Sequence, residues 1–385
     1  MELLELKKKF IELYGEGEIR IFHSPGRINL IGEHIDYNGG RVFPCALEIG
    51  TYGLVRKRKD RKINFASTNF ELKVSSDIDN IKYKEQDDWT NYPKGVIKLI
   101  ADKGYEVGGM DILISGNIPN GAGLSSSASL ELLTGVIVNS LFNAGKLERI
   151  ELVKIGQEAE NKFVGVNCGI MDQFAIGMGK KNKAILLNCN TLDYTYADVS
   201  LGAYSLVIMN TNKRRALNES KYNERRAECE EAVNIIKGFK NISNLCELNV
   251  KEFKVLKKYL VKENIRKRAE HVIYENERVM KAYECLNESK LDKFGKLLIE
   301  SHISLREFYE VTGKELDTLV DESLKLEGCI GARMTGAGFG GCAIALVKKE
   351  NICEFEMKVK ESYNKIIGYE PSFYYSGIGE GIEEI

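Results

Sequence analysis

The order of apolar and polar positions in the first half of the chain predicts a mixture of strands and helices. Runs of apolar and β-branched residues predict strands at Ile19–His23, Gly50–Arg56, Lys62–Ala66, Met110–Ser115 and Lys183–Asn188. Apolar residues spaced three and four positions apart predict helices at Tyr92–Asp102, Ser126–Asn143 and Ile150–Phe163. Because strands and helices do not strictly alternate, we expect an α+β fold with mixed sheets and not a doubly wound parallel sheet.

The second half is mainly helical from about residue 219 onward. The predicted helices are Ser220–Phe239, Lys251–Tyr259, Arg266–Leu286, Leu291–Tyr309 and Glu315–Leu326. Strands are predicted among them at Tyr204–Met209, Cys342–Val347 and Ser372–Gly377. We therefore expect an N-terminal lobe over residues 1–195 and a helix-rich C-terminal lobe over residues 196–385.

Length and charge narrow the function classes. A chain of 385 residues exceeds the size at which one hydrophobic core usually stops growing, so two lobes with a cleft between them are expected. The formal net charge is -1, from 55 basic and 56 acidic residues, which provides no overall field for nucleic acid or for an anionic membrane. We therefore expect no nucleic-acid partner and no membrane partner.

The sequence contains no targeting signal, and its cysteines and histidines show no disulfide or zinc-site pattern. Residues 1–14 have a helical pattern without the apolar core of a signal peptide, and no window approaches the ~20 apolar residues of a membrane span. The nine cysteines include no C-x-x-C pair, and the four histidines lack zinc-site spacing. We expect a soluble cytoplasmic protein with reduced thiols, whose metal ion arrives with a substrate.

A glycine-serine segment at residues 119–129, Pro-Asn-Gly-Ala-Gly-Leu-Ser-Ser-Ser-Ala-Ser, lies between a predicted strand and a predicted helix. Glycines let backbone N–H groups converge on one point, and a helix N-terminus adds unpaired donors, so the segment suits a nucleotide phosphate. An ordinary turn is the alternative. Likewise the three consecutive serines either cap the helix or contact phosphate and Mg²⁺.

Other phosphate-binding patterns are absent or misleading. The Walker pattern and the protein-kinase motifs do not occur. Residues 336–341 match G-x-G-x-x-G, but an apolar strand run follows them where a dinucleotide site requires a helix. We expect residues 336–341 to form a tight loop between two strands.

The polar segment at residues 24–40 contains Arg27, Glu33, His34 and Asp36 among glycines and asparagines. We expect a loop that buries no core. As a connector it would hold only caps and turns, whereas its carboxylates and histidine suit a ligand rich in hydroxyl groups. Arg27 can neutralise charge that develops on a phosphate or an alkoxide.

A third cluster at residues 167–174 places one acid, Asp172, in apolar and glycine-rich surroundings. Asp172 is either a helix cap or a desolvated general base for a sugar hydroxyl. Glu158 and Glu160 lie on the preceding predicted helix, where one of them can reach a metal ion.

Together these segments resemble the motifs of the GHMP small-molecule kinases. Residues 26–37, Gly-Arg-Ile-Asn-Leu-Ile-Gly-Glu-His-Ile-Asp-Tyr, resemble the galactokinase signature of that family. Residues 119–129 resemble its nucleotide loop, residues 334–342 its third motif, and residues 168–174 a further galactokinase-like segment. The resemblance extends from residue 20 to the C-terminus and implies a two-lobed fold with the active site in the cleft.

The resemblance also implies roles for individual residues. Asp172 would be the catalytic base, and Arg27 would lie beside the C1 oxygen and stabilise the transition state. The sugar would be held by Glu33, His34, Asp36, Gly169 and Tyr222. The nucleotide would be held by Gly121, Ala122, Gly123, Leu124, Ser125, Ser126 and Ser127, with Trp89 near the adenine. Mg²⁺, which accompanies ATP, would be bound by Ser127 and Glu160.

The implied reaction is phosphorylation of the C1 hydroxyl of D-galactose by ATP, in a protein that we expect to be a monomer. Ile35 stands where many galactokinases carry Thr, and some relatives that act on N-acetylgalactosamine also have Ile there. An N-acetylgalactosamine kinase is therefore one alternative. A regulator that binds the ligands without catalysis is the other, although the intact Ser125–Ser129 run favours an enzyme.

Overall fold

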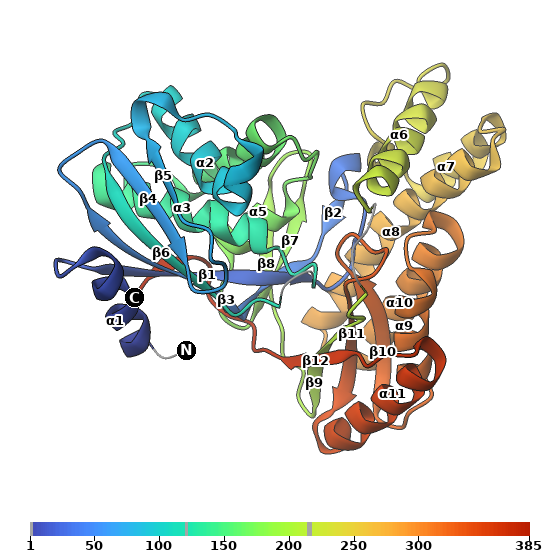
Figure 1. Ribbon diagram of the computed structural model, residues 1–385. Helices are drawn as coiled ribbons and strands as arrows, with labels where there is room; N and C mark the ends of the chain where they lie inside the picture. Colours follow the sequence, from blue (N-terminus) through green and yellow to red (C-terminus); the bar gives the residue numbers. More distant parts are fainter. Residues whose placement is uncertain (1–2, 120–121, 214–217) are drawn as a thin grey trace.

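The computed structural model describes residues 3–119, 122–213 and 218–385. Two lobes lie side by side, and each contains a sheet covered by helices (Figure 1). This architecture confirms the α+β expectation. It brings segments from both halves of the chain together where the lobes meet.

A six-stranded sheet forms the core of the first lobe. Its strands, in spatial order, are β13 (Glu383–Glu384), β1 (Arg20–Asn29), β3 (Pro44–Lys57), β6 (Met110–Gly116), β4 (Lys62–Ser67) and β5 (Val74–Asp77). All neighbours are antiparallel except β4 and β6, which are parallel. Leu54 and Leu113 pack against helix α1 (Leu3–Tyr14), whereas Val55 and Ile112 face the main core. Because successive side chains of a strand point to opposite faces, both faces of the sheet are buried.

Helices cover the other face of this sheet. They are α2 (Asn91–Asp102), α3 (Ser126–Phe142), α4 (Arg149–Glu158), the π-helical turn η4 (Ala159–Val164) and α5 (Met171–Met178). Helix α3 is buried on nearly all sides, as expected for a helix that is apolar all round. It packs against β1 and β3, and this packing holds the glycine-serine segment at its N-terminus.

The second lobe contains a four-stranded antiparallel sheet. Its strands, in order, are β10 (Cys329–Thr335), β11 (Cys342–Lys348), β9 (Tyr204–Asn210) and β12 (Ser372–Tyr375). Its helices are α6 (Asn218–Ile236), α7 (Val250–Leu256), α8 (Glu263–Asn287), α9 (Leu291–Ser304), the π-helical turn η7 (Leu305–Tyr309), α10 (Gly313–Leu324) and α11 (Ile352–Ile367). The tight loop expected at residues 336–341 is confirmed, since it joins β10 to β11 as a hairpin.

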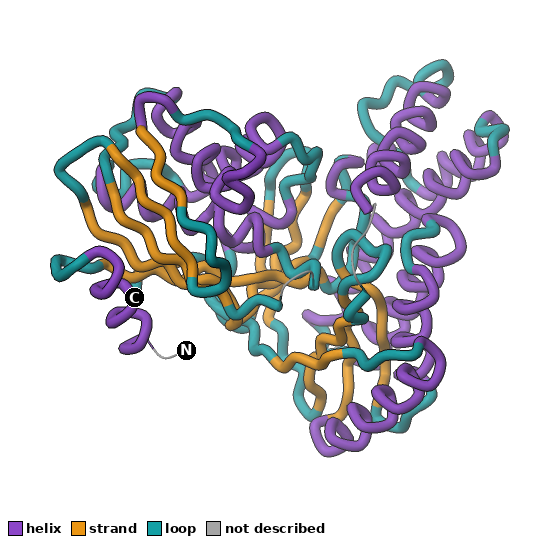
Figure 2. The backbone as a smooth tube through the Cα atoms, viewed as in Figure 1, coloured by secondary structure: helices purple, strands orange, loops and turns teal. Residues whose placement is uncertain are grey.

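A smaller sheet lies between these two sheets (Figure 2). It consists of β2 (Arg41–Val42), β7 (Lys183–Asn188) and β8 (Tyr194–Asp198), and helix α8 of the second lobe contacts β2 and β8. The expected lobe boundary at residues 195 and 196 falls inside β8, and the chain end returns to the first sheet as β13. The division of the chain into 1–195 and 196–385 stays a prediction.

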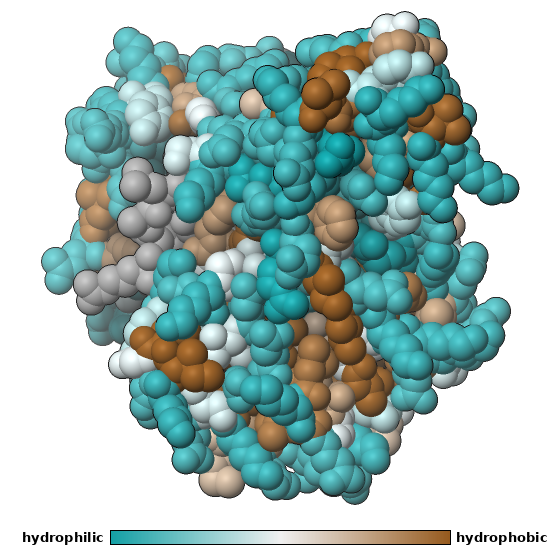
Figure 3. All heavy atoms as spheres, turned by 90° about the vertical axis from the view of Figure 1, so that its right-hand side faces the viewer, coloured by the Kyte–Doolittle hydropathy of each residue, from teal (hydrophilic) through white to brown (hydrophobic). Residues whose placement is uncertain are grey.

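Six short 3-10 helices complete the described chain. They are η1 (Asp36–Asn38), η2 (Ile78–Asn80), η3 (Glu85–Thr90), η5 (Leu245–Glu247), η6 (Lys257–Tyr259) and η8 (Lys349–Asn351). Within the described ranges, no helix is long and apolar enough to cross a membrane. The face of the molecule on the side of the second lobe is covered mainly by hydrophilic residues (Figure 3).

One expectation about the N-terminal polar segment is wrong. We expected residues 24–40 to form a loop that buries no core, but residues 24–29 continue strand β1 and are buried. Glu33 and His34 are buried as well. The physical reason is that β1 pairs with β3 and is packed by helices α3 and α5, while Arg333 of β10 closes the end of the strand by donating to the backbone oxygens of Asn29 and Leu30, at 3.0 and 3.1 Å.

Candidate active site

Four polar or glycine-rich segments meet at the junction of the lobes. The backbone N–H of Arg27 donates to the carbonyl oxygen of Leu124 at 3.1 Å, which joins strand β1 to the glycine-serine segment. Glu33 accepts from the backbone N–H of Gly336 at 2.7 Å, which joins the signature segment to the β10–β11 loop. The side chain of Asp172, at the start of α5, completes the junction.

Arg27 and Asp172 form a bidentate ion pair. Arg27 Nε lies 2.7 Å from Asp172 Oδ1, and Arg27 Nη2 lies 2.6 Å from Oδ2. A third donor, Arg27 Nη1, is bonded to the carbonyl oxygen of Gly123 at 2.8 Å. The Arg27 side chain is 5% exposed and that of Asp172 is 29% exposed, so a ligand can reach the carboxylate. Such paired planar groups fix orientation as well as charge.

Asp172 does not cap helix α5. The N-cap residue is Ile170, and no side chain caps that end of the helix. Instead Asp172 accepts a hydrogen bond from the Ser125 hydroxyl in addition to those from Arg27. Of the two interpretations left open by the sequence, the helix cap is therefore wrong.

The glycine-serine segment leads into α3 through left-handed backbone. Gly123 has φ 76° and Ser125 has φ 63°, and Ser125 occupies the N-cap position without a side-chain cap bond. Ala122 and Leu124 are buried, so their side chains anchor the segment in the core. Gly121 lies outside the described residues. The serines therefore do not cap α3 through their side chains, and its first-turn donors suit an anion.

The carboxylate of Glu160 lies close to three polar side chains, one of which, Ser127, belongs to the glycine-serine segment. Its carboxylate accepts from Gln173 Nε2 at 2.8 Å and from Cys168 Sγ at 3.3 Å, and the Ser127 hydroxyl also bonds to it. Burial raises the pKa of Glu160, and the nearby charge of Asp172 adds to the rise. The two residues expected to bind Mg²⁺, Ser127 and Glu160, are therefore brought together.

A second buried carboxylate, Glu131 of α3, lies next to Glu160. Gln173 Nε2 donates to Glu131 Oε2 at 2.9 Å, while Glu131 Oε1 and Gln173 Oε1 are buried and have no hydrogen-bond partner among the described residues. Burial raises the pKa of Glu131 well above its ordinary value. Carboxylate oxygens are the kind of ligand that Mg²⁺ prefers. Among the described residues no set of three or more His, Cys, Asp or Glu side chains can hold a metal alone, so phosphate oxygens and water would supply the other ligands.

The residues expected to hold the sugar surround Asp172 on the other side. Burial raises the pKa of Glu33 to about 7 and that of Asp36 to about 6, and the charge of Asp172 contributes to the shift of Asp36. A Cβ atom at Gly169 would overlap the Asp36 carboxylate, so any larger residue there would displace that side chain. The Tyr222 ring lies 5.7 Å from the ring of His34.

His34 has both ring nitrogens bonded within the protein. Its Nδ1 lies 2.8 Å from the Tyr37 hydroxyl, and its Nε2 lies 3.0 Å from the carbonyl oxygen of Ala337. Trp89 is buried in η3, where its ring contacts those of Phe65 and Phe70. Its indole N–H has no partner among the described residues.

Several residues of the site escaped sequence reasoning. Glu131 and Arg333 are single charged residues within apolar stretches, and this contrast is the signal that can identify them. Gln173 carries no such signal. Its position depends on contacts between segments far apart in the chain.

Comparison with known proteins agrees with this geometry. The family model described as the galactokinase galactose-binding signature matches residues 8–57. The N-terminal domain model of the GHMP kinases matches residues 91–180, and the C-terminal model matches residues 282–365.

Similar chains are found at full length. The galactokinase of Clostridium tetani is 66% identical, with 100% of this chain and 98% of the relative covered. The crystal structure of Lactococcus lactis galactokinase complexed with galactose has a TM-score of 0.97 at 50% identity and covers 100% of both chains. Methanococcus jannaschii mevalonate kinase, at 21% identity and a TM-score of 0.66 over 94% of this chain and 99% of that one, shares the fold. The chain therefore belongs to the galactokinase family of the GHMP kinases.

Proposed function

We propose that the protein transfers the terminal phosphoryl group of ATP to the C1 hydroxyl of D-galactose, giving galactose 1-phosphate and ADP. The observation that carries this proposal is the Arg27–Asp172 pair, which lies between the galactose-binding signature and the glycine-serine segment. Phosphoryl transfer to a hydroxyl needs three groups at one point: a carboxylate that the acceptor can reach, an arginine and a helix N-terminus. This site has all three.

On the acceptor side, Asp172 would take or orient the proton of the C1 hydroxyl. Arg27 holds the carboxylate in place and would offset the negative charge that develops during transfer. The sugar would lie among Glu33, His34, Asp36, Gly169 and Tyr222. Because both nitrogens of His34 are already engaged, His34 would contribute mainly the wall of the pocket beside Tyr222.

On the donor side, the backbone of residues 121–124 and the hydroxyls of Ser125, Ser126 and Ser127 would hold the phosphates at the N-terminus of α3. Trp89 would lie near the adenine. Ser127 and Glu160 would hold Mg²⁺, which neutralises phosphate charge when it is bound.

Galactose is favoured over N-acetylgalactosamine. The side chain of Ile35, the residue that raised this alternative, is fully buried within the hydrophobic core. Lactococcus lactis galactokinase, which shares 50% identity over the whole chain, is complexed with galactose. We also propose a cytoplasmic monomer, since the site is built from one chain and the cysteines are free thiols.

An ATP-coupled assay with one preparation and three sugars tests the proposal. We expect galactose to exceed glucose and N-acetylgalactosamine in kcat/KM by roughly 10²- to 10⁴-fold, because a sugar that misplaces hydroxyls leaves buried polar groups unpaired. An N-acetylgalactosamine value at or above that of galactose would reassign the substrate. Binding of galactose and ATP without turnover of any sugar would indicate a regulator.

A further inference from the structure

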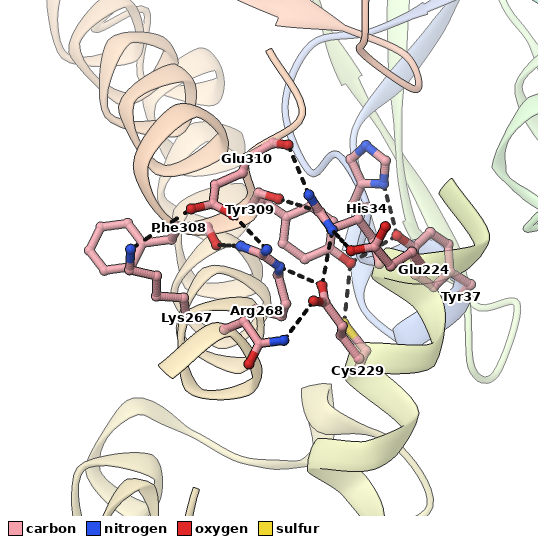
Figure 4. Close-up of polar contacts among 12 residues, drawn as sticks. His34, Tyr37, Glu224, Cys229, Lys267, Arg268, Phe308, Tyr309 and Glu310 are labelled. Carbon is pink, nitrogen blue, oxygen red and sulfur yellow. Dashed lines mark hydrogen bonds and ion pairs between the residues drawn. The ribbon is translucent and has the colours of Figure 1, made fainter. Parts of the chain in front are cut away.

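A chain of hydrogen bonds runs from the buried Cys229 of helix α6, through the half-buried Tyr37, to the signature segment. Cys229 Sγ lies 3.2 Å from the Tyr309 hydroxyl oxygen, which lies 2.9 Å from that of Tyr37. The Tyr37 oxygen in turn lies 2.8 Å from His34 Nδ1. Figure 4 shows Tyr309 between Tyr37 and Cys229, with His34 at the end of the chain.

A backbone carbonyl oxygen determines which atom donates in the hydrogen bond between Tyr37 and His34. His34 Nε2 lies 3.0 Å from the carbonyl oxygen of Ala337, and because a carbonyl oxygen only accepts, Nε2 must carry a hydrogen. Burial lowers the pKa of His34 to about 3, so the ring is neutral and has one hydrogen. His34 Nδ1 must therefore accept.

This assignment fixes every other bond in the chain. The Tyr37 hydroxyl donates its one hydrogen to His34 and can only accept from Tyr309. The Tyr309 hydroxyl then accepts from the Cys229 thiol. Both tyrosines keep their hydrogens, because burial raises their pKa values well above the ordinary range. The chain is thus a series of donors that ends at His34.

Two arginines hold the backbone at Tyr309, where η7 ends. Arg225 Nε donates to the carbonyl oxygen of Tyr309 at 2.8 Å, and Arg268 Nη1 donates to that of Phe308. Arg268 also pairs with Glu310 at 2.7 Å (Figure 4). These bonds satisfy carbonyl groups that a helix end leaves without partners. Both the backbone and the hydroxyl group of Tyr309 are therefore held in place by hydrogen bonds.

We propose that Tyr309 is a positioning residue for the sugar side of the site, because it fixes the orientation of the His34 ring through Tyr37. This inference rests on the proposed function, in which His34 belongs to the sugar-binding set. His34 also holds Ala337 of the β10–β11 loop, so the chain fixes both the pocket wall and that loop.

Burial of Tyr309 and Cys229 keeps water from replacing the hydrogen bonds that their side chains make. Tyr309 is 0% exposed and Cys229 is 1% exposed, so water cannot substitute for a missing hydroxyl. His34 itself has φ 62°, a backbone conformation that persists only where its surroundings impose it. Without the Tyr309 hydroxyl, the hydroxyl of Tyr37 loses its donor and is free to turn away from His34.

The test compares Tyr309→Phe with Tyr363→Phe as a matched control. Tyr363 is also buried and donates to a backbone oxygen, that of Thr211 at 2.8 Å, outside the chain. We expect Tyr309→Phe to raise the galactose KM about 3- to 10-fold with kcat within about 2-fold, since a less ordered pocket weakens ground state and transition state alike. Tyr363→Phe should leave both constants within about 2-fold.

Two variants of Cys229 test the inference even if Tyr309→Phe fails to fold. Cys229→Ala deletes the last donor and should raise the galactose KM in the same direction, whereas Cys229→Ser keeps a donor and should restore it. Side-chain ¹⁵N NMR of histidine, with His34 assigned by loss of its signals in His34→Gln, should show hydrogen on Nε2. In Tyr37→Phe the Nδ1 signal should move toward that of a nitrogen without a hydrogen bond.

Three results would overturn the inference. They are a hydrogen on Nδ1 of His34, a galactose KM that shifts equally in Tyr309→Phe and Tyr363→Phe, and equal constants for the alanine and serine variants of Cys229. Failure of the proposed function is seen separately, as inactivity of the unmodified protein with galactose, and the NMR spectra still decide the hydrogen-bond chain in that case.

Discussion

At the scale of single residues, two aspartates with similar partners have different surroundings. Asp172 pairs with Arg27 and keeps part of its side chain exposed at the junction of the lobes. Asp111 pairs with Arg56 and Arg58, both at 2.8 Å, and its side chain is 0% exposed within the first sheet. The same chemical group therefore suits catalysis in one place and stability in the other.

This contrast gives a matched pair of variants. Asp172→Asn should lower kcat with galactose by on the order of 10²- to 10⁴-fold, because the amide cannot take the hydroxyl proton. Its thermal midpoint should also fall, because the buried Arg27 loses its anion, so kcat is the quantity that separates the two variants. Asp111→Asn should lower the thermal midpoint while kcat stays within about 2-fold, because a buried charge network loses its anion. Turnover by Asp172→Asn close to that of the unmodified enzyme would reject Asp172 as the base.

At the scale of elements, the helices α3, η4 and α5 bring three polar side chains to one place. Glu131 comes from α3, Glu160 from η4 and Gln173 from α5, and the amide of Gln173 bonds to both carboxylates. Residues two positions apart lie on nearly opposite sides of a helix, so Glu160 of η4 faces the interior while Glu158, the last residue of α4, pairs with Lys162 at the surface.

The metal assignment is tested on this helix. Glu160→Gln should raise the Mg²⁺ concentration for half-maximal activity about 10-fold and weaken Mn²⁺ binding, measured by electron paramagnetic resonance with ADP present. Glu158→Gln is the control and should change neither quantity. Equal effects of the two substitutions, or none, would remove Glu160 from the metal site.

At the scale of the whole molecule, the signature segment ties the two lobes together. Arg333 and Thr335 of β10 bond to the backbone of Asn29, and Gly32 N–H donates to Glu275 of α8 at 3.0 Å. Glu33 accepts from Gly336 and lies 3.5 Å from Arg333. The stability of the molecule therefore depends on a carboxylate that burial holds at a raised pKa.

Glu33 gives this contact a defined pH dependence. Its pKa rises from 4.5 in the unfolded chain to about 7 in the folded one. Between these values the folded state binds the additional proton, so Glu33 lowers the free energy of unfolding progressively as pH rises from 4.5 to 7. The full effect, about 3 kcal/mol at about 1.4 kcal/mol per pKa unit, is reached above that window.

Glu33→Gln removes the titration and isolates this effect. The free energy of unfolding of the unmodified protein, minus that of Glu33→Gln, should fall as pH rises from 4.5 to 7 and should then level off. Denaturant titration of both proteins at each pH gives the difference. A difference that is constant across the window, or that rises, would contradict the raised pKa of Glu33.

The sequence alone located most regular elements and the motifs. Strands were predicted well where apolar runs are bounded by polar residues, as at Lys183–Asn188, and long helices where the apolar spacing persists. The short strands β2, β5, β8 and β13 and the helices α5 and α11 were not predicted, and β10 was implied only as the strand before the loop at residues 336–341. The roles of the site residues came from a resemblance of motifs and not from local pattern.

Only the tertiary structure decided which polar residues meet. Arg27 and Asp172 are 145 positions apart, and the sequence left Asp172 either a cap or a base. The burial of residues 24–29 was missed because strand β3 and helices α3 and α5, which lie later in the chain, provide the packing. Hydrophobic periodicity reports the faces of one element. Ion pairs, shifted pKa values and the hydrogen-bond chain to His34 depend instead on which elements pack together, because burial and charge act through space and not along the sequence.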